Sequence, residues 1–215
     1  MKKVIILFAM VFLLSGCTNI EGSSFDTLLA EAANSDLKIY NTYRKGYKYY
    51  LPANMYVANS KNNNEFIKNK FDTFYMYIDL ISYLGEKPLE YENKGETYYF
   101  SYLSLKDKSG YIAIKNTQDE KYLVEIAYNY AKIEVIVEEP HLNATVSEAM
   151  IILSSIEYND SFLRGLTEES LLNYKEESVD IFKKGATTDS NKLLQYIDDY
   201  DGTEDYEVPD YDVIK

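Results

Sequence analysis

The sequence predicts an α+β fold, in which a mostly antiparallel β-sheet is flanked by helices. Three observations favour this fold class. Residues 25–33 have a helix-forming composition, residues 40–137 are rich in Tyr and Ile and are interrupted by polar loops, and residues 145–153 carry the apolar spacing of a helix. The 215 residues are 46% hydrophobic, which is enough for a core and excludes wholesale disorder.

Residues 1–16 have the form of a secretory signal peptide. Two lysines precede an uncharged apolar run over residues 4–14, which is shorter than the roughly 20 residues that a membrane-spanning helix needs. The run ends in the sequence Leu14-Ser15-Gly16-Cys17, and Cys17 is the only cysteine of the chain. A single cysteine excludes a disulfide framework and a cysteine-based zinc site.

This four-residue sequence resembles the lipobox of bacterial lipoproteins. The resemblance implies that the Cys17 thiol receives a diacylglyceryl group and that a dedicated signal peptidase cuts just before it. Membrane lipid and the prolipoprotein-processing enzymes would then be partners. The protein would be anchored to the cell membrane, facing outside the cytoplasm, because two acyl chains at one residue give stable attachment. The alternative is an ordinary secretory signal with an incidental cysteine.

The mature chain is expected to begin with a flexible, lipidated tether over residues 17–24. Ser24 is then placed to cap a helix over residues 25–33. Strands are expected over residues 47–51, 55–58, 72–81, 97–105 and 111–115, and within residues 122–137. Polar stretches over residues 59–65, 85–95 and 106–110 predict the loops between them.

The segment 122–137 contains a change of register. Its apolar residues fall on even positions from Tyr122 to Tyr128 and on odd positions from Ala131 to Val137. One straight strand would therefore send the two halves to opposite faces. A hairpin turning at Asn129-Tyr130 places all of them on one face, and a β-bulge within a continuous strand is the alternative.

A helix is expected to follow this segment. Thr145 and Glu148 match a capping box, and the apolar residues after Thr145 recur at the spacing of a helix with one buried face. The α+β domain is expected over residues 25–160, and residues 161–198 are expected to hold further helices, over 168–182 and 192–198.

Residues 199–215 are expected to form an acidic, disordered tail, because they are too polar to bury a core. The tail could also dock on a partner, with Tyr206, Pro209, Asp210 and Tyr211 as the candidate docking residues. A solubilising tail with no partner is the alternative.

The stretch from Gly46-Tyr47-Lys48-Tyr49-Tyr50-Leu51-Pro52 through Ile156 is similar to the PsbP-like α/β/α sandwich. Members of that superfamily open with a Gly-Tyr-x-aromatic-x-x-Pro strand and close with a helix after a final hairpin. The resemblance implies a non-catalytic binding or accessory role, and it identifies no ligand.

The sequence carries no clear catalytic signature. A formal net charge of −13 argues against nucleic acid as a partner. The nucleophile elbow, the phosphate loop and the zinc-protease helix are absent from the sequence, so no catalytic residue, metal or cofactor is expected. Ser35 and Lys38 match S-x-x-K without its companion motifs, and His141 is either a general base or an exposed loop residue. The 23 tyrosines indicate either an aromatic binding platform or ordinary strand composition.

Three functions remain open from these observations. The first is a membrane-anchored, non-enzymatic binding or accessory module with an unidentified envelope protein or ligand as its partner. The second is a lipid-anchored envelope hydrolase, which would use a pair of carboxylates. The third is an accessory subunit that docks on a membrane protein through the acidic tail.

Overall fold

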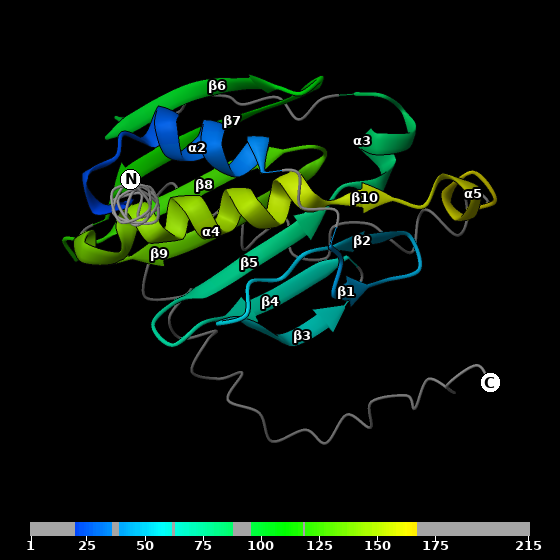
Figure 1. Ribbon diagram of the computed structural model, residues 1–215, viewed down its shortest axis with the longest axis horizontal. Coiled ribbons are helices and arrows are strands. Elements are labelled where there is room, and N and C mark those ends of the chain that lie inside the picture. The colour runs from blue at the N-terminus through cyan, green and yellow to red at the C-terminus, as the bar shows by residue number, and fades with distance from the viewer. Residues whose placement is uncertain (1–19, 36–38, 62, 88–95, 118, 167–215) are drawn as a thin grey trace, which may run out of the picture. The chain divides into compact units, whose positions relative to one another are not determined.

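The computed structural model describes residues 20–35, 39–61, 63–87, 96–117 and 119–166, all of which lie in one compact unit, Met1–Glu177. These residues form four α-helices, two 3-10 turns and two antiparallel sheets, which confirms the α+β prediction (Figure 1). The helices are α2 (Phe25–Asn34), α3 (Leu80–Leu84), α4 (Leu142–Ser155) and α5 (Asp160–Leu163), and the 3-10 turns are η1 (Ile20–Gly22) and η2 (Glu139–His141). No helix of this described part is long and apolar enough to cross a membrane.

The large sheet has seven strands. They are β3 (Tyr56–Lys61), β4 (Asn64–Lys68), β5 (Thr73–Ile78), β6 (Tyr99–Leu105), β7 (Lys108–Asn116), β8 (Tyr122–Tyr128) and β9 (Ala131–Val137). Their order in the sheet is β3-β4-β5-β9-β8-β7-β6, with every neighbouring pair antiparallel. A second, three-stranded sheet has the order β1-β2-β10 and consists of β1 (Thr42–Tyr43), β2 (Tyr47–Tyr49) and β10 (Glu157–Tyr158).

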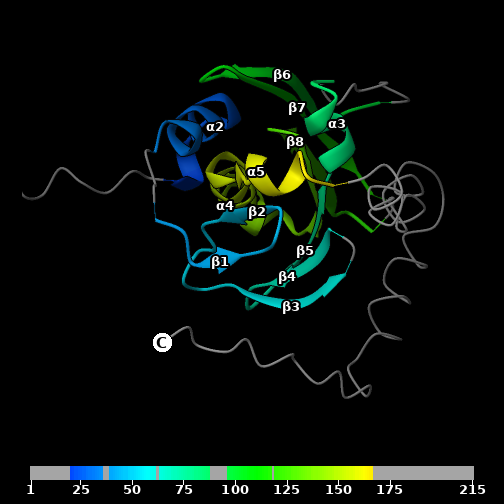
Figure 2. The same ribbon diagram turned by 90° about the vertical axis from the view of Figure 1, so that its right-hand side faces the viewer.

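Helix α4 organises the core. It packs against α2 and against the central strands β8 and β9 of the large sheet. Figure 2 shows α2, α4 and the small sheet on the same side of the large sheet. The side chains that α4 buries, including Val146, Ala149, Met150 and Leu153, meet those of the sheet in one hydrophobic cluster. The apolar spacing in the sequence therefore identified the buried face of this helix correctly.

The expected hairpin at Asn129-Tyr130 is confirmed. Strands β8 and β9 pair directly across it, with Ile126 opposite Ile133. Asn129 and Tyr130 have φ values of 56° and 59°, as both central residues of a type I′ turn require. The Asn129 side chain compensates for the strain by donating to the Ile156 carbonyl at 2.9 Å. The β-bulge alternative is therefore excluded.

The start of α2 is also as expected. The Ser24 Oγ accepts a hydrogen bond from the Thr27 backbone N–H at 3.3 Å, so the side chain satisfies a donor that the first helical turn leaves free.

The prediction of a capping box at Thr145 and Glu148 is wrong. Helix α4 begins earlier, at Leu142, because the 3-10 turn η2, which contains Pro140, leads directly into it. Thr145 is 1% exposed inside the helix. The Glu148 carboxylate accepts from the side-chain amide of Asn54 at 2.7 Å and from a loop asparagine.

The structure differs from the sequence-based predictions in two further segments. The loop expected over residues 59–65 is instead the hairpin of β3 and β4, whose turn includes Asn63 at a φ of 64°. The strand expected over residues 72–81 ends at Ile78, because the Asp79 Oδ1 accepts from the Ser82 N–H at 2.8 Å and starts α3. The helices expected over residues 168–182 and 192–198, and the acidic tail, lie outside the described residues.

Candidate functional site

The lipobox residues Leu14, Ser15, Gly16 and Cys17 lie outside the described part of the chain, which begins at Ile20. Residues 20–24 were expected to belong to a flexible tether. They are instead fixed to α4, because the Asn143 Nδ2 donates to the carbonyls of Ile20 at 3.0 Å, Glu21 at 3.1 Å and Ser23 at 3.1 Å. Only Thr18 and Asn19 separate this attachment from Cys17.

The Glu65 carboxylate on β4 is a deeply buried charged group. Glu65 is 1% exposed. Its Oε1 accepts from the Tyr47 hydroxyl at 2.7 Å, and its Oε2 accepts from the Tyr49 hydroxyl at 2.5 Å and from the Arg44 Nη2 at 2.9 Å. We call these four residues the Glu65 cluster. It connects the large sheet to the small one, since Tyr47 and Tyr49 belong to β2.

The strand periodicity explains this arrangement. Tyr47 and Tyr49 are alternate residues of β2 and share one face, with their rings stacked 6.3 Å apart. Burial, followed by the nearby charge of Glu65, raises the pKa of both phenols far above the usual value near 10. Both hydroxyls therefore stay neutral donors, and Arg44 supplies the balancing charge. The geometry is that of a closed structural cluster with its hydrogen bonds satisfied.

A second carboxyl group lies on the face of the large sheet that points away from α4. Glu134 of β9 is 4% exposed and stands directly opposite Glu125 of β8. The Lys132 Nζ lies 3.4 Å from the Glu134 Oε1, and the Tyr111 hydroxyl donates to the Glu125 Oε1 at 2.6 Å. We call these four residues the Glu134 cluster.

Burial dominates the electrostatics of the Glu134 cluster. It raises the pKa of Glu134 well above the usual carboxyl range, Lys132 lowers it, and the neighbouring Glu125 raises it again. The ion pair with Lys132 would favour an ionised Glu134, but desolvation outweighs it. The Glu134 carboxyl group therefore favours its neutral, protonated form.

His141 is the last residue of the 3-10 turn η2 and directly precedes α4. Its Nδ1 lies 3.9 Å from the Asp72 Oδ2, and its ring centroid lies 4.5 Å from that of Phe71. Burial raises the pKa of Asp72, and His141 opposes that shift. The structure corrects the expectation of an exposed loop residue, because His141 lies in η2 and its side chain is 33% exposed. Ser35 ends α2 and its hydroxyl donates to the Ala32 carbonyl at 2.6 Å, while Lys38 of the S-x-x-K match lies outside the described residues.

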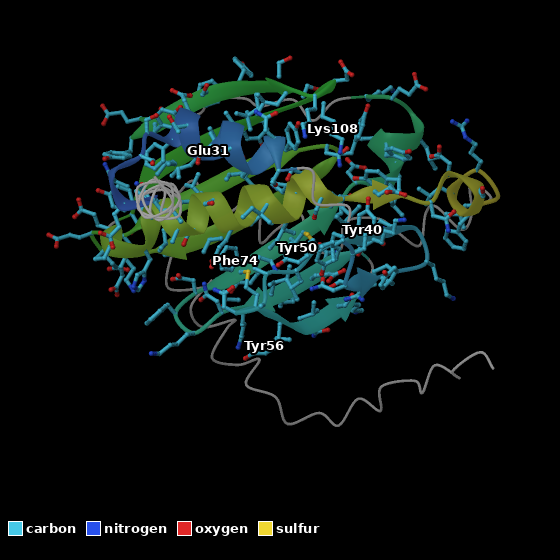
Figure 3. The ribbon with its side chains drawn as sticks, in the orientation of Figure 1. Glu31, Tyr40, Tyr50, Tyr56, Phe74 and Lys108 are labelled. Atoms are coloured by element: carbon cyan, nitrogen blue, oxygen red, sulfur yellow. The ribbon has the colours of Figure 1, made fainter. Side chains whose placement is uncertain are left out.

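Several tyrosines pair with carboxylates at the surface. The Tyr83 hydroxyl donates to Asp160 at 2.5 Å, the Tyr99 hydroxyl donates to Asp26 at 2.6 Å, and Tyr40, labelled in Figure 3, donates to a glutamate of β10. Burial and the hydrogen bond raise the pKa of Tyr83 and of Tyr99 to about 12. These contacts give three of the tyrosines a structural role.

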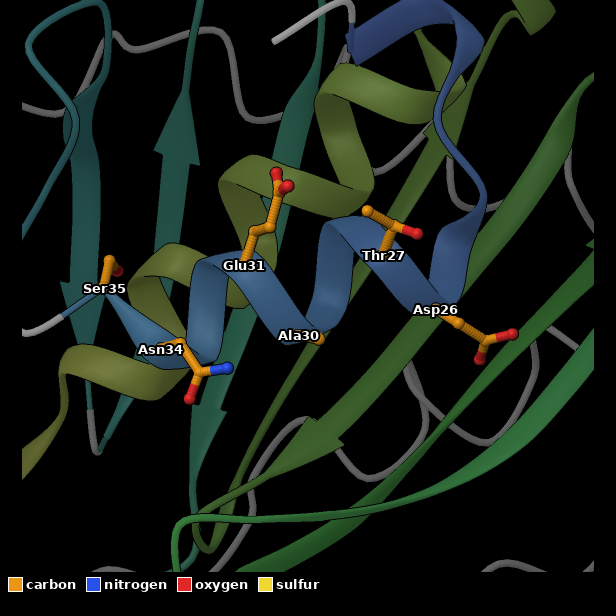
Figure 4. Close-up of a pocket in the computed structure, with 6 residues that line it drawn as sticks. All are labelled: Asp26, Thr27, Ala30, Glu31, Asn34 and Ser35. Atoms are coloured by element: carbon orange, nitrogen blue, oxygen red, sulfur yellow. The ribbon is translucent and has the colours of Figure 1, made fainter. Parts of the chain in front are cut away.

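A shallow hollow runs along the outer side of α2 (Figure 4). Its lining residues are Asp26, Thr27, Ala30, Glu31, Asn34 and Ser35. Figure 4 shows that these side chains spread outward from a single helix and do not converge on a point. Within the described residues, no three His, Cys, Asp or Glu side chains are placed to hold a metal ion.

Comparison with protein-family models, with curated proteins and with solved structures finds no match. The similarities to the lipobox and to the PsbP-like sandwich therefore stay predictions. The candidate docking residues Tyr206, Pro209, Asp210 and Tyr211 lie outside the described residues. Glu65 could not be identified from the sequence, because it lies in a polar run that predicts a loop. The Glu125–Glu134 pair could have been identified, because the hairpin register places these two residues opposite each other.

Proposed function

We propose that this chain is a lipid-anchored protein of the bacterial cell membrane, facing outside the cytoplasm, and that its folded domain is a non-enzymatic binding or accessory module. The observation that carries the proposal is the sequence Leu14-Ser15-Gly16-Cys17 directly after an apolar run of signal-peptide length. The resemblance to the PsbP-like sandwich supports the binding role.

The start of the folded domain fits such an anchor. The three residue-to-residue steps from Cys17 to Ile20 span at most about 10 Å when fully extended. Ile20 is held to α4 through Asn143 at 3.0 Å. A diacylglyceryl group on Cys17 would therefore keep the start of α4 close to the membrane surface.

The proposal is tested by replacing the lipidated residue in the full-length precursor. Cys17→Ala should abolish labelling by a fatty-acid analogue and leave the precursor uncut, because the thiol is the atom that accepts the lipid. Ser15→Ala is the matched control, since it keeps a small residue in the motif and should preserve both labelling and cleavage. Normal labelling and processing of Cys17→Ala would refute the anchor.

The envelope hydrolase is a second candidate, and the Glu134 cluster is the observation that favours it. The raised pKa of Glu134 favours a protonated carboxyl group opposite the Glu125 carboxyl group, and glycoside hydrolysis uses a pair of carboxyl groups. The purified protein should then release soluble fragments from envelope polysaccharide, and Glu134→Gln should abolish that release. Glu120→Gln, at an exposed residue, is the control and should leave the release unchanged. Absence of release by the unaltered protein would eliminate this candidate.

A further inference from the structure

The connection between β4 and β5 presents an exposed aromatic ring on a fixed turn. Phe71 is 62% exposed. The Asn69 Oδ1 accepts from the backbone N–H of Phe71 at 2.8 Å and of Asp72 at 2.7 Å, while the Asn69 Nδ2 donates to Glu148 of α4 at 3.1 Å. The turn is thus held by side-chain hydrogen bonds at both its ends. These hydrogen bonds hold the turn in a conformation that leaves the Phe71 side chain exposed to solvent.

This turn lies beside the attachment of the N-terminal segment. The Phe71 ring contacts the His141 ring with their centroids 4.5 Å apart, and Asn143, two residues further along, binds the Ile20 carbonyl. Figure 1 shows the β4–β5 connection and the start of α4 at the same, left-hand end of the large sheet. The chain from Cys17 to Ile20 reaches at most about 10 Å. A membrane anchor at Cys17 therefore brings this end of the sheet, and Phe71 with it, to the bilayer.

The chemistry of the turn suits a lipid surface. The Lys70 Nζ lies 5.1 Å from the centroid of the Phe71 ring, so a cation flanks the aromatic tip. Aromatic rings and lysines are the side chains that settle at the interface between headgroups and acyl chains. Glu138, the residue before the neighbouring turn η2, pairs with Lys121 at 3.5 Å, and Glu139 is the first residue of η2. Anionic headgroups repel these carboxylates, which confines the contact to the β4–β5 turn.

We propose that the turn over residues 69–72 rests on the membrane that holds the anchor, with the Phe71 ring inserted at the acyl-chain boundary and Lys70 among the headgroups. The inference rests on the proposed lipidation of Cys17. It adds a second contact with the membrane, which fixes the orientation of the domain and directs the opposite end of the sheet, with α3, away from the lipid.

The absence of tryptophan from the chain makes this orientation measurable. Phe71→Trp introduces a single fluorophore at the tip of the turn. Ile81→Trp is the matched control, because Ile81 is 46% exposed on α3, beyond the other end of β5. The six residues of β5 separate the two sites by roughly 20 Å. Each full-length variant is expressed, processed in bacterial membranes, purified in detergent and reconstituted into phosphatidylethanolamine–phosphatidylglycerol vesicles with brominated acyl chains.

Bromine quenches only fluorophores that reach the acyl chains. We expect the emission of Trp at position 71 to fall about twofold relative to vesicles without bromine, and that of Trp at position 81 to stay unchanged. Intact-mass measurement of the same samples reports the lipid on Cys17. A missing lipid would overturn both the proposed function and this inference. A lipidated chain with equal quenching at the two positions would overturn the inference alone. A blue shift at position 71 without quenching would also overturn it, because protein would then cover the ring.

Discussion

Replacing Glu65 by Ala should be among the most damaging single changes in the described domain. The Glu65 carboxylate is 1% exposed and accepts three hydrogen bonds, from Arg44, Tyr47 and Tyr49. Removal of one partner from a buried ion pair typically costs 3–5 kcal/mol, and each buried hydroxyl left without an acceptor adds about 1–3 kcal/mol. The Arg44 side chain is 30% exposed and can recover water, which moderates the loss. We therefore expect a loss of at least about 4 kcal/mol in the free energy of unfolding.

Urea unfolding of residues 17–215 measures this loss directly. The midpoint should fall while the slope with denaturant stays constant, because the surface exposed on unfolding changes little. In a thermal scan the same loss corresponds to a decrease of roughly 8–16 °C for a domain of this size. Tyr56→Phe is the control, since Tyr56 is 58% exposed on β3 and its hydroxyl contributes little.

A double-mutant cycle with Tyr49→Phe distinguishes the loss of the Glu65–Tyr49 hydrogen bond from the cost of the cavity that Glu65→Ala leaves. If Glu65 and Tyr49 stabilise the fold through their mutual hydrogen bond, the two changes together should cost at least about 1 kcal/mol less than the sum of the single changes. A loss below about 1 kcal/mol for Glu65→Ala would refute the reasoning, because it would place the carboxylate in water. Strict additivity would show that the hydrogen bond contributes nothing.

Three further predictions concern the large sheet. Ile133→Ala should cost about 2–5 kcal/mol in urea unfolding, because Ile133 is 1% exposed in the core, and a loss below this range would place it outside the core. Gly110→Ala should cost at least about 2 kcal/mol, since its Cβ would lie 1.9 Å from the Ala127 carbonyl oxygen. Gly165→Ala is the control and should stay within about 0.5 kcal/mol, because its Cβ would lie 3.4 Å from the nearest atom, the Phe162 carbonyl oxygen. Equal effects would contradict the clash. The pKa of Glu134 is raised in the folded state, so its contribution to stability is complete below the unfolded pKa near 4.5 and is lost as the pH rises through the folded pKa. Glu134→Gln should therefore reduce the decline of stability above pH 4.5, measured by urea unfolding at several pH values. An unchanged decline would show that another group causes the pH dependence.

Local signals in the sequence predicted the elements that depend on neighbouring residues. The change of register around Asn129-Tyr130 predicted the β8–β9 hairpin, because strand periodicity is a local property and a core face tolerates no slip. Ser24 predicted the start of α2 for the same reason, since a cap acts within one turn of its helix.

Contacts between distant residues could not be predicted in this way. Glu65 meets Tyr47 and Tyr49 only after β4 and β2 have been brought together in space. The start of α4 shows the same limit. Thr145 and Glu148 have the residue types and spacing of a capping box. In the folded protein, however, Thr145 is buried and Glu148 accepts a hydrogen bond from a loop asparagine. Local residue propensity determines that a helix forms, and tertiary packing determines the residue at which it begins.

The composition of the chain explains why so many tyrosines bind carboxylates. With 35 acidic and 22 basic residues, the cations cannot pair with every carboxylate. A phenol supplies a strong donor without a charge, and Tyr49 supplies it inside the core, where a lysine would be costly. Within the described residues, six tyrosine hydroxyls donate to five carboxylates, and Glu65 accepts two of them. Salt screens exposed ion pairs but has little effect on a buried hydroxyl–carboxylate bond. The buried hydroxyl–carboxylate bonds of the Glu65 cluster should therefore persist over a wide range of ionic strength.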